Sequence, residues 1–299
     1  MVQSCHWWAL LSAALAVSAV RPNPKDPAED LDLSELTSGL TPKCQAEMKG
    51  ILSDFMSRCK PWCKTWCSPG TSTEWWCKSE VKNLILGHPS LHQWFISLAT
   101  TKKESVLWSG FSGGGEAERT SIEALLHFAE FLDKEPVTPS TELGKIIYEH
   151  GDFQMCYKDP KAQELLFHFW NKASRAFVEG MAQKQQSSVV MFINKDTNPE
   201  VERNLYHSVL WNYELPSLGS EVKETLLPGS SVRPWQPQLI IVDLRGTCTA
   251  LRSLIPKQLG VSSLIKEWLE DKPIICIECV SPCKLNQDFA EELRKKVGL

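Results

Sequence analysis

Residues 238–280 read QLIIVDLRGTCTALRSLIPKQLGVSSLIKEWLEDKPIICIECV, and this stretch says most about the fold. It begins with QLIIVDL and ends with KPIICIECV, two short runs rich in Ile and Val that are typical of buried strands. Between them, TALRSLIPKQLG and SSLIKEWLED place apolar residues three and four apart, which predicts helices. A strand, a helical connection and a second strand predict a parallel pair.

Other segments extend this pattern in both directions. SVVMFIN (188–194) predicts a further strand, and SVLWNYELP (208–216) predicts a fourth. FSGGGEAER (111–119) predicts a flexible loop without the spacing of a nucleotide-binding motif. Helical spacing fills the chain before Gln186, in QAEMKGILSDFMSRC, EVKNLILG, HQWFISLAT, SIEALLHFAEFLDK and PKAQELLFHFWNKASRAFVEGMAQK.

These patterns predict an α+β or α/β protein that is stabilised by disulfides. Residues 44–186 are expected to form a helical N-terminal subdomain, and residues 187–299 an α/β C-terminal subdomain. The C-terminal half would contain a small, mostly parallel sheet flanked by helices. An active-site cleft is expected between the two halves.

The start of the chain indicates export. Residues 1–19 hold an apolar core and end in Val-Ser-Ala, which predicts a signal peptide, with a membrane anchor as the alternative. Residues 20–43 are acidic and rich in proline, which predicts a flexible leader. No later segment is apolar enough to span a membrane, so we expect a secreted or luminal protein, a granule included. The net charge of −4 argues against a nucleic-acid binder.

Ten cysteines follow the predicted signal peptide, and an even number in an exported chain points to disulfides. Zinc is the alternative for two groups of cysteines, because their spacings resemble metal sites. One group is Cys59, Cys63, Cys67 and Cys77, and the other is Cys276, Cys279 and Cys283.

Four local patterns hold residues that could carry chemistry. Trp108 lies in VLWSGF, and Glu123 lies in TSIEALLHFAEFLD, where the helix register leaves Ser121 and Glu130 as alternatives. Trp170 and Ser174 are four residues apart and therefore share one face of a helix. Glu214 lies in NYELPSL. Each alone is more typical of core packing or a solvated surface.

Together and in this order, the four patterns resemble the ADP-ribosyl cyclase and NAD glycohydrolase family. The matching segments are LWS (107–109), IE (122–123), FWNKAS (169–174), VMFIN (190–194) and YELPSL (213–218). The resemblance runs from about Cys59 to Cys283, and FWNKAS with YELPSL is its most specific part. It also implies a disulfide between Cys248 and Cys276.

The resemblance implies an enzyme that releases nicotinamide from NAD and forms cyclic ADP-ribose, ADP-ribose or both, in calcium-messenger metabolism. Glu214 would be the catalytic carboxylate that stabilises an oxocarbenium-like ribose, with Glu123 as a second catalytic acid. Trp108 and Trp170 would stack on the substrate, and Ser174 would bind a phosphate or a ribose hydroxyl. NAD, with NADP as an alternative, is the substrate, so no cofactor and no metal are expected.

Two other functions stay open at this point. A catalytically silent family member would act as an extracellular nucleotide-binding or protein-binding module. An unrelated disulfide-rich interaction module would make the matches at Trp108, Trp170 and Glu214 coincidental. The sequence is compatible with a monomer or a homodimer.

Overall fold

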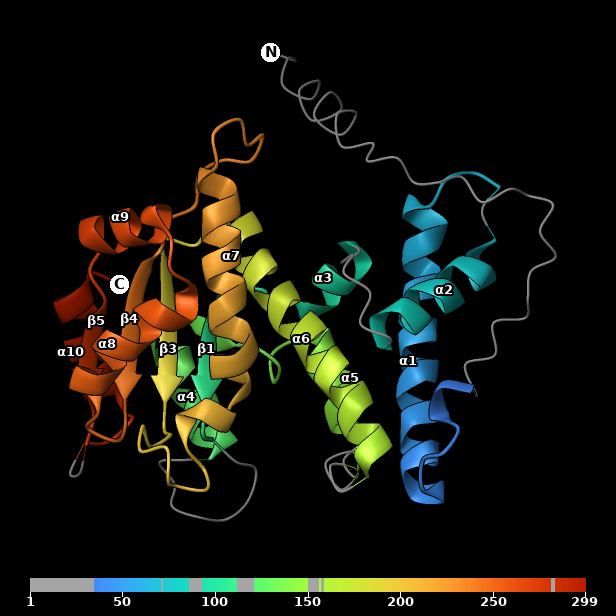
Figure 1. Ribbon diagram of the computed structural model, residues 1–299, viewed down its shortest axis with the longest axis horizontal. Coiled ribbons are helices and arrows are strands. Elements are labelled where there is room, and N and C mark those ends of the chain that lie inside the picture. The colour runs from blue at the N-terminus through green and yellow to red at the C-terminus, as the bar shows by residue number, and fades with distance from the viewer. Residues whose placement is uncertain are drawn as a thin grey trace. The chain divides into compact units, whose positions relative to one another are not determined.

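Five parallel strands form one sheet in the order β2-β1-β3-β4-β5 (Figure 1). The computed structural model describes residues 35–70, 72–85, 93–111, 121–149, 156, 159–280 and 283–299. The strands are β1 (Glu104–Ser109), β2 (Lys134–Pro136), β3 (Ser188–Ile193), β4 (Gln238–Asp243) and β5 (Ile275–Glu278). Because β2 is an edge strand, Pro136 interrupts no central ladder.

Alternate residues of the central strands enter two separate apolar layers, one on each face of the sheet. On β3, Met191 packs into the larger layer and Phe192 packs into the smaller one. β4 alternates in the same way, with Ile241 in the larger layer and Ile240 in the smaller one. Strands that are buried on both faces require side chains that are apolar throughout, which explains the continuous Val and Ile runs.

Helices cover both layers. The larger layer is formed with α1 (Pro42–Trp66), α2 (Thr73–Ile85), α3 (Gln93–Ala99), α5 (Glu142–Glu149), α6 (Pro160–Gln183), α7 (Leu215–Leu226), α8 (Cys248–Leu259) and α9 (Ser263–Asp271). The smaller layer is formed with α4 (Ile122–Phe131) and α10 (Gln287–Val297). Short helical segments are η1 (Glu35–Thr37), η3 (Leu205–His207) and η4 (Leu210–Glu214).

The stretch 238–280 folds as its sequence predicts. β4 and β5 are parallel neighbours, in a register that pairs Ile241 with Cys276. α8 and α9 connect them. The strand expected over residues 188–194 is β3, and helices occupy each of the five segments with helical spacing. The α+β class with a small parallel sheet is therefore confirmed.

The wholly helical N-terminal half is wrong in two places. β1 and β2 both lie within residues 44–186, and β1 pairs directly with β3. The sheet therefore takes strands from both expected halves, and residues 32–299 form one compact unit. β2 has three residues, too few for an alternating or continuous apolar pattern to reveal it.

The end of the predicted flexible leader is also different from expectation. Leu36 and Leu40 are buried in the larger apolar layer. The backbone N–H of Thr41 donates to the carboxylate of Asp159 (2.9 Å), which also caps the N-terminus of α6. The predicted signal peptide (1–19), the leader as far as residue 34 and the glycine-rich loop over 112–119 lie outside the described residues.

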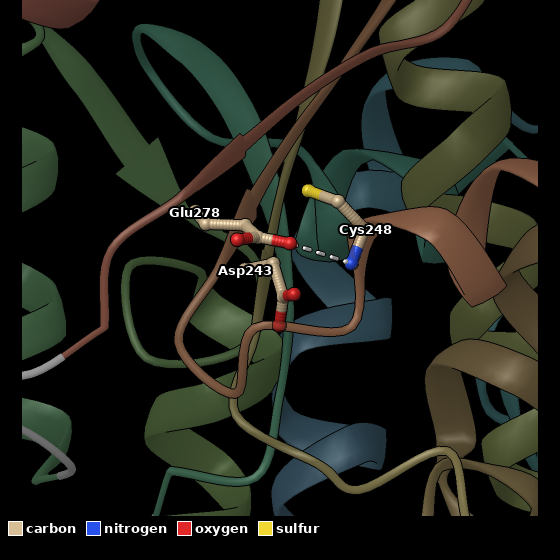
Figure 2. A group of neighbouring side chains, drawn as sticks. All are labelled: Asp243, Cys248 and Glu278. Atoms are coloured by element: carbon tan, nitrogen blue, oxygen red, sulfur yellow. Dashed lines mark hydrogen bonds between the residues drawn. The ribbon is translucent and has the colours of Figure 1, made fainter.

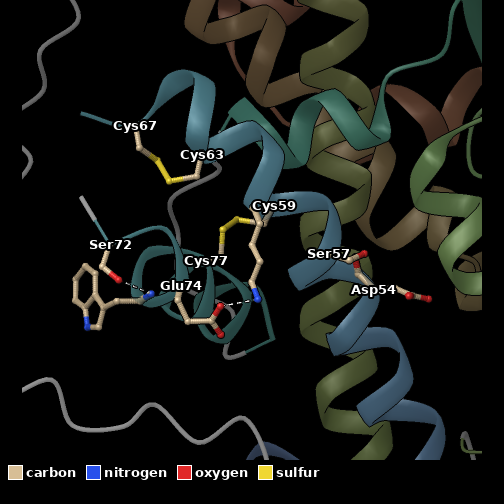
Figure 3. Close-up of a disulfide and its surroundings, with 10 residues drawn as sticks. Asp54, Ser57, Cys59, Cys63, Cys67, Ser72, Glu74 and Cys77 are labelled. Carbon is tan, nitrogen blue, oxygen red and sulfur yellow. Dashed lines mark hydrogen bonds and ion pairs between the residues drawn. A yellow bond between two sulfur atoms is a disulfide. The ribbon is translucent and has the colours of Figure 1, made fainter. Parts of the chain in front are cut away.

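The ten cysteines that follow Cys5 form five disulfides. These bonds are Cys44–Cys156, Cys59–Cys77, Cys63–Cys67, Cys248–Cys276 and Cys279–Cys283. The first zinc hypothesis is therefore wrong, because its four cysteines are paired with one another and offer no thiolate (Figure 3). The second is wrong because Cys276 is bonded to Cys248 and Cys279 is bonded to Cys283, which leaves no thiolate in that group either. Within the described residues, no helix is long and apolar enough to cross a membrane.

Candidate functional site

Glu214 ends a one-turn π-helix, η4, and α7 continues directly from it. The strand predicted over residues 208–216 is therefore wrong. The buried residues Trp211, Leu215, Leu218 and Val222 recur at helical spacing, and this pattern continues beyond Pro216. The segment up to Pro216 contains only an apolar and aromatic run, which has the composition of a strand.

Pro216 gives a physical reason for the wider turn. Proline has no N–H to donate and its ring crowds the carbonyl four residues earlier, which disfavours a regular α-helix there. The chain passes this point with a bond from the N–H of Leu215 to the carbonyl of Leu210, five residues back. The side-chain amide of Gln258 on α8 donates to the carbonyl of Trp211 (2.8 Å). Single π-turns of this kind occur frequently at functional sites.

The carboxyl group of Glu214 is buried, with 4% of the residue exposed. Within the described residues its Oε2 atom has no hydrogen-bond partner. Burial raises the pKa of this carboxyl to about 8, because an ionised carboxylate loses its hydration there. A buried acceptor without a protein partner is costly, which makes Glu214 a candidate for contact with a ligand or for a role in a reaction.

Trp108 is half-buried on β1, next to β3 in the sheet. Its indole Nε1–H donates to the carbonyl of Val137 (2.8 Å), which fixes the orientation of the ring. Phe111 meets the ring edge to face, with 6.3 Å between ring centroids. Because the N–H is already used, Trp108 offers a ligand the exposed part of its ring and not this donor.

Trp170 and Ser174 lie one turn apart on α6, as predicted. Trp170 is half-buried, and Ser174 is fully buried. A helical serine commonly bonds the carbonyl one turn back, yet among the described residues the Oγ of Ser174 has no partner. The site region therefore contains a second buried polar atom that is not satisfied.

The elements that carry Glu214, Trp108 and the Trp170–Ser174 pair contact one another. η4 packs against both β1 and α6. The rings of Phe167 on α6 and Tyr213 on η4 meet edge to face at 5.5 Å, next to Glu214 in the sequence. The elements that carry these sequence-predicted residues are therefore neighbours. Trp170 packs against the larger apolar layer, whereas Trp108 packs against both layers.

Glu123 is placed differently. It is exposed in the first turn of α4, whose apolar side packs into the smaller layer, on the other face of the sheet from α6. The two alternative residues, Ser121 and Glu130, are not buried acids either. Ser121 caps the helix by accepting from the N–H of Ala124 (3.1 Å), and Glu130 is exposed. A catalytic role for Glu123 stays a prediction.

Acidic residues at the carboxyl ends of β4 and β5 were not foreseen from the sequence (Figure 2). Ligand atoms of Asp243, Cys248 and Glu278 lie within 4.8 Å of one another. The residues do not fit a metal ion, because Cys248 is bonded to Cys276, the pairing that the resemblance implied. The carboxylate of Asp243 also accepts the backbone N–H groups of Arg245 and Thr247. Asp243 therefore shapes the loop that leads into α8.

Three cations gather at the same edge of the sheet, after β3 and β4. Burial lowers the pKa of Lys195, and the positive charges of Arg203 and Arg245 lower it further. The guanidinium of Arg245 donates to the carbonyl of Asn194 (3.5 Å). Gly110 makes the close approach of β1 to this edge possible, because a Cβ there would lie 2.3 Å from the Asn194 carbonyl oxygen.

The sequence does not reveal this cluster because its three residues are separated along the chain. The carboxyl ends of parallel strands are nonetheless where open α/β sheets bind ligands, and anionic groups complement clustered Arg and Lys side chains. The carboxylate of Asp196, in the same loop as Lys195, accepts the N–H of Asn198 (2.7 Å).

Comparison with protein-family models, with curated proteins and with solved structures finds no match to this chain.

Proposed function

We propose that this protein cleaves NAD at the bond between nicotinamide and ribose. The observation that carries the proposal is Glu214, a buried carboxyl with an unsatisfied oxygen on an element that contacts both β1 and α6. The resemblance to the ADP-ribosyl cyclase and NAD glycohydrolase family independently selects the same residue. The substrate is a cation at the reacting ring, and its positive charge favours ionisation of a carboxyl that burial keeps neutral in the free protein.

The reaction uses the carboxylate electrostatically or as a nucleophile. The bond from ribose carbon 1 to the nicotinamide nitrogen breaks, its electron pair moves to the ring, and neutral nicotinamide leaves. The ionised carboxylate of Glu214 stabilises the oxocarbenium-like carbon or forms an ester with it. Water then attacks this carbon and releases a proton, which gives ADP-ribose. Attack by the adenine ring of the same molecule gives cyclic ADP-ribose.

Binding residues follow from the remaining geometry. The faces of Trp108 and Trp170 stack on the cationic nicotinamide and on the adenine. The Oγ of Ser174 donates to a phosphate or a ribose hydroxyl, which satisfies the buried atom. Lys195, Arg203 and Arg245 neutralise the diphosphate at the carboxyl edge of the sheet. Five disulfides support secretion or a luminal location, because such bonds persist in oxidising compartments.

One observation favours the second function, a nucleotide-binding module without turnover. With a pKa of about 8, Glu214 is mostly protonated at neutral pH in the free protein and then cannot stabilise a cation. In the enzyme, binding of NAD promotes loss of the proton from Glu214. In the binding module, Glu214 keeps its proton when the nucleotide is bound. The two functions are distinguished by product formation and not by affinity.

The test uses residues 20–299, produced through an oxidising secretory route and incubated with NAD, with chromatographic separation of the products. We expect nicotinamide together with ADP-ribose, cyclic ADP-ribose or both. Glu214→Gln should lower the turnover rate by about a thousandfold or more, because the amide keeps the shape and loses the charge. Glu267→Gln, an exposed position on α9, is the matched control. Most of the activity remaining in Glu214→Gln would refute the role of Glu214.

A further inference from the structure

Four tryptophans gather where α1 ends and α2 begins. Trp62, Trp66, Trp75 and Trp76 lie within fifteen residues, whereas the whole chain has 12 tryptophans in 299 residues. The rings of Trp62 and Trp76 are stacked, with centroids 5.6 Å apart. Trp66 extends the stack from Trp62 at 6.3 Å. We name the three residues whose rings are in contact, Trp62, Trp66 and Trp76, the aromatic face.

The aromatic face is exposed at one end. Trp66 is 71% exposed, and the other two tryptophans are half-buried. A single exposed apolar side chain is ordinary in a soluble protein, but a ring stack that ends in an exposed indole is a contiguous apolar surface. Surfaces of this kind mark places where a protein meets another molecule or a membrane.

Two disulfides hold the aromatic face in position (Figure 3). Cys59–Cys77 joins α1 to α2, and Cys63–Cys67 closes the end of α1. Lys60 and Glu74 add an ion pair between the helices (2.5 Å). Because the rings are fixed before any contact is made, binding through them loses little conformational entropy.

The charge around the aromatic face is opposite to that of the whole chain. Residues 57–82 carry five basic and two acidic side chains, a net charge of +3, whereas the whole chain carries −4. One of the two acids, Glu80, is buried. The charged residues are Arg58, Lys60, Lys64, Glu74, Lys78, Glu80 and Lys82.

We propose that the aromatic face binds the surface of a phospholipid bilayer that contains anionic lipid. Indole rings favour the headgroup region of a bilayer, where the ring is apolar on its faces and polar at its N–H. Lysines next to such rings are attracted by anionic headgroups, and their long stems reach past the rings. A neutral glycan would gain nothing from the +3 charge, and a protein groove would be matched by aliphatic side chains as well as by indoles.

The binding is peripheral and reversible. Indoles enter the headgroup layer, and the helices that carry them stay outside it. The proposal does not depend on NAD cleavage, because α1 and α2 carry none of the residues assigned to that reaction. It predicts only that the protein concentrates on anionic membranes through this end of the molecule.

The test is sedimentation of residues 20–299 with sucrose-loaded vesicles of phosphatidylcholine alone and of phosphatidylcholine mixed with phosphatidylserine. We expect binding to the mixed vesicles that weakens with added salt. Trp66→Ser should weaken this binding about tenfold or more, because the indole is the leading contact. Lys64→Gln, at an exposed lysine on α1, should weaken it roughly fivefold. Val261→Ser removes another exposed apolar side chain, 97% exposed, and should change nothing.

Three outcomes would overturn the proposal. The first is the absence of sedimentation with either kind of vesicle. The second is binding that Trp66→Ser leaves unchanged, in protein whose unfolding temperature equals that of the unsubstituted chain. The third is Trp66-dependent binding to immobilised heparin, or Trp66-dependent dimerisation in analytical ultracentrifugation, without vesicle binding. Either result would assign the aromatic face to a sulfated glycan or to a second copy of the chain.

Discussion

The aromatic face and the segment around Glu214 depart from the usual distribution of polar and apolar groups in opposite directions. At the aromatic face, Trp66 is an apolar ring in water. In η4, Glu214 is an ionisable group among apolar side chains. The two regions are also held by different forces: disulfides fix the exposed rings, and packing with a π-turn fixes the buried acid.

This difference has a physical reason. An exposed ring gains little burial energy, so its position depends on contacts with neighbouring rings and on the disulfides that fix the two helices. A buried carboxyl is held in place by the side chains packed around it. The loss of hydration opposes its ionisation. The first region should therefore respond to loss of a disulfide, and the second to pH.

The largest expected effect is on stability at Glu214. Because the folded protein raises this pKa from 4.5 to about 8, it retains a proton that the unfolded chain loses, and stability falls as the pH rises between these values. Glu214→Gln removes this loss and should raise the free energy of unfolding by up to roughly 5 kcal/mol at about pH 8. Denaturant unfolding at about pH 4 and pH 8 measures it. Equal effects at both pH values would show that Glu214 ionises normally.

The next largest effect tests how the disulfides contribute to stability and to vesicle binding. Replacing Cys59 and Cys77 together by alanine opens a link between residues 18 apart and should cost about 3 kcal/mol of unfolding free energy. Vesicle binding should fall with the loss of the fixed stack, while NAD cleavage by the folded protein stays unchanged. Parallel assays of both properties test this. A loss of NAD cleavage in folded protein would break the comparison, because it would couple the two regions.

A third effect concerns the pH dependence of the reaction. If free Glu214 must lose its proton, kcat/KM for NAD should rise about tenfold per pH unit up to about pH 8 and then level off. Initial rates at low NAD concentration between about pH 6 and pH 9 measure it. A flat profile over this range would contradict the requirement for an ionised Glu214 with a raised pKa.

The smallest effect distinguishes the cations at the sheet edge from ordinary surface charges. Lys195→Ala should raise KM for NAD about tenfold and leave kcat nearly unchanged, because a charge-assisted contact to the diphosphate is lost in substrate and transition state alike. Lys266→Ala, on an exposed face of α9, is the control. Steady-state kinetics of both variants provide the measurement, and equal KM values would remove Lys195 from the site.

The sequence predicts most of the sheet and less of the site. β3 and β4 were predictable because strands buried on both faces are apolar throughout. β5 was predictable because its short run of Ile and Cys keeps a strand-like composition at the edge of the sheet, where it is only partly buried. β1 and η4 were not, because each depends on its neighbours: Trp108 is positioned by Val137, and η4 by Pro216 and Gln258. The Lys195 cluster becomes visible only when the sheet order places β3 next to β4.

The disulfide connectivity has a consequence for how the chain can be cut. Among the described cysteines, three bonds lie between residues 44 and 156, and two lie between residues 248 and 283. A protease that cuts once between residues 157 and 247 produces two fragments that no disulfide links, even without a reducing agent. Trp108 then belongs to the first fragment, and a cut before η4 leaves Glu214 in the second. After such a cut, the two sides of the candidate site are held together only by packing and by the hydrogen bonds of the sheet, as in a noncovalent complex of two chains that each carry their own disulfides.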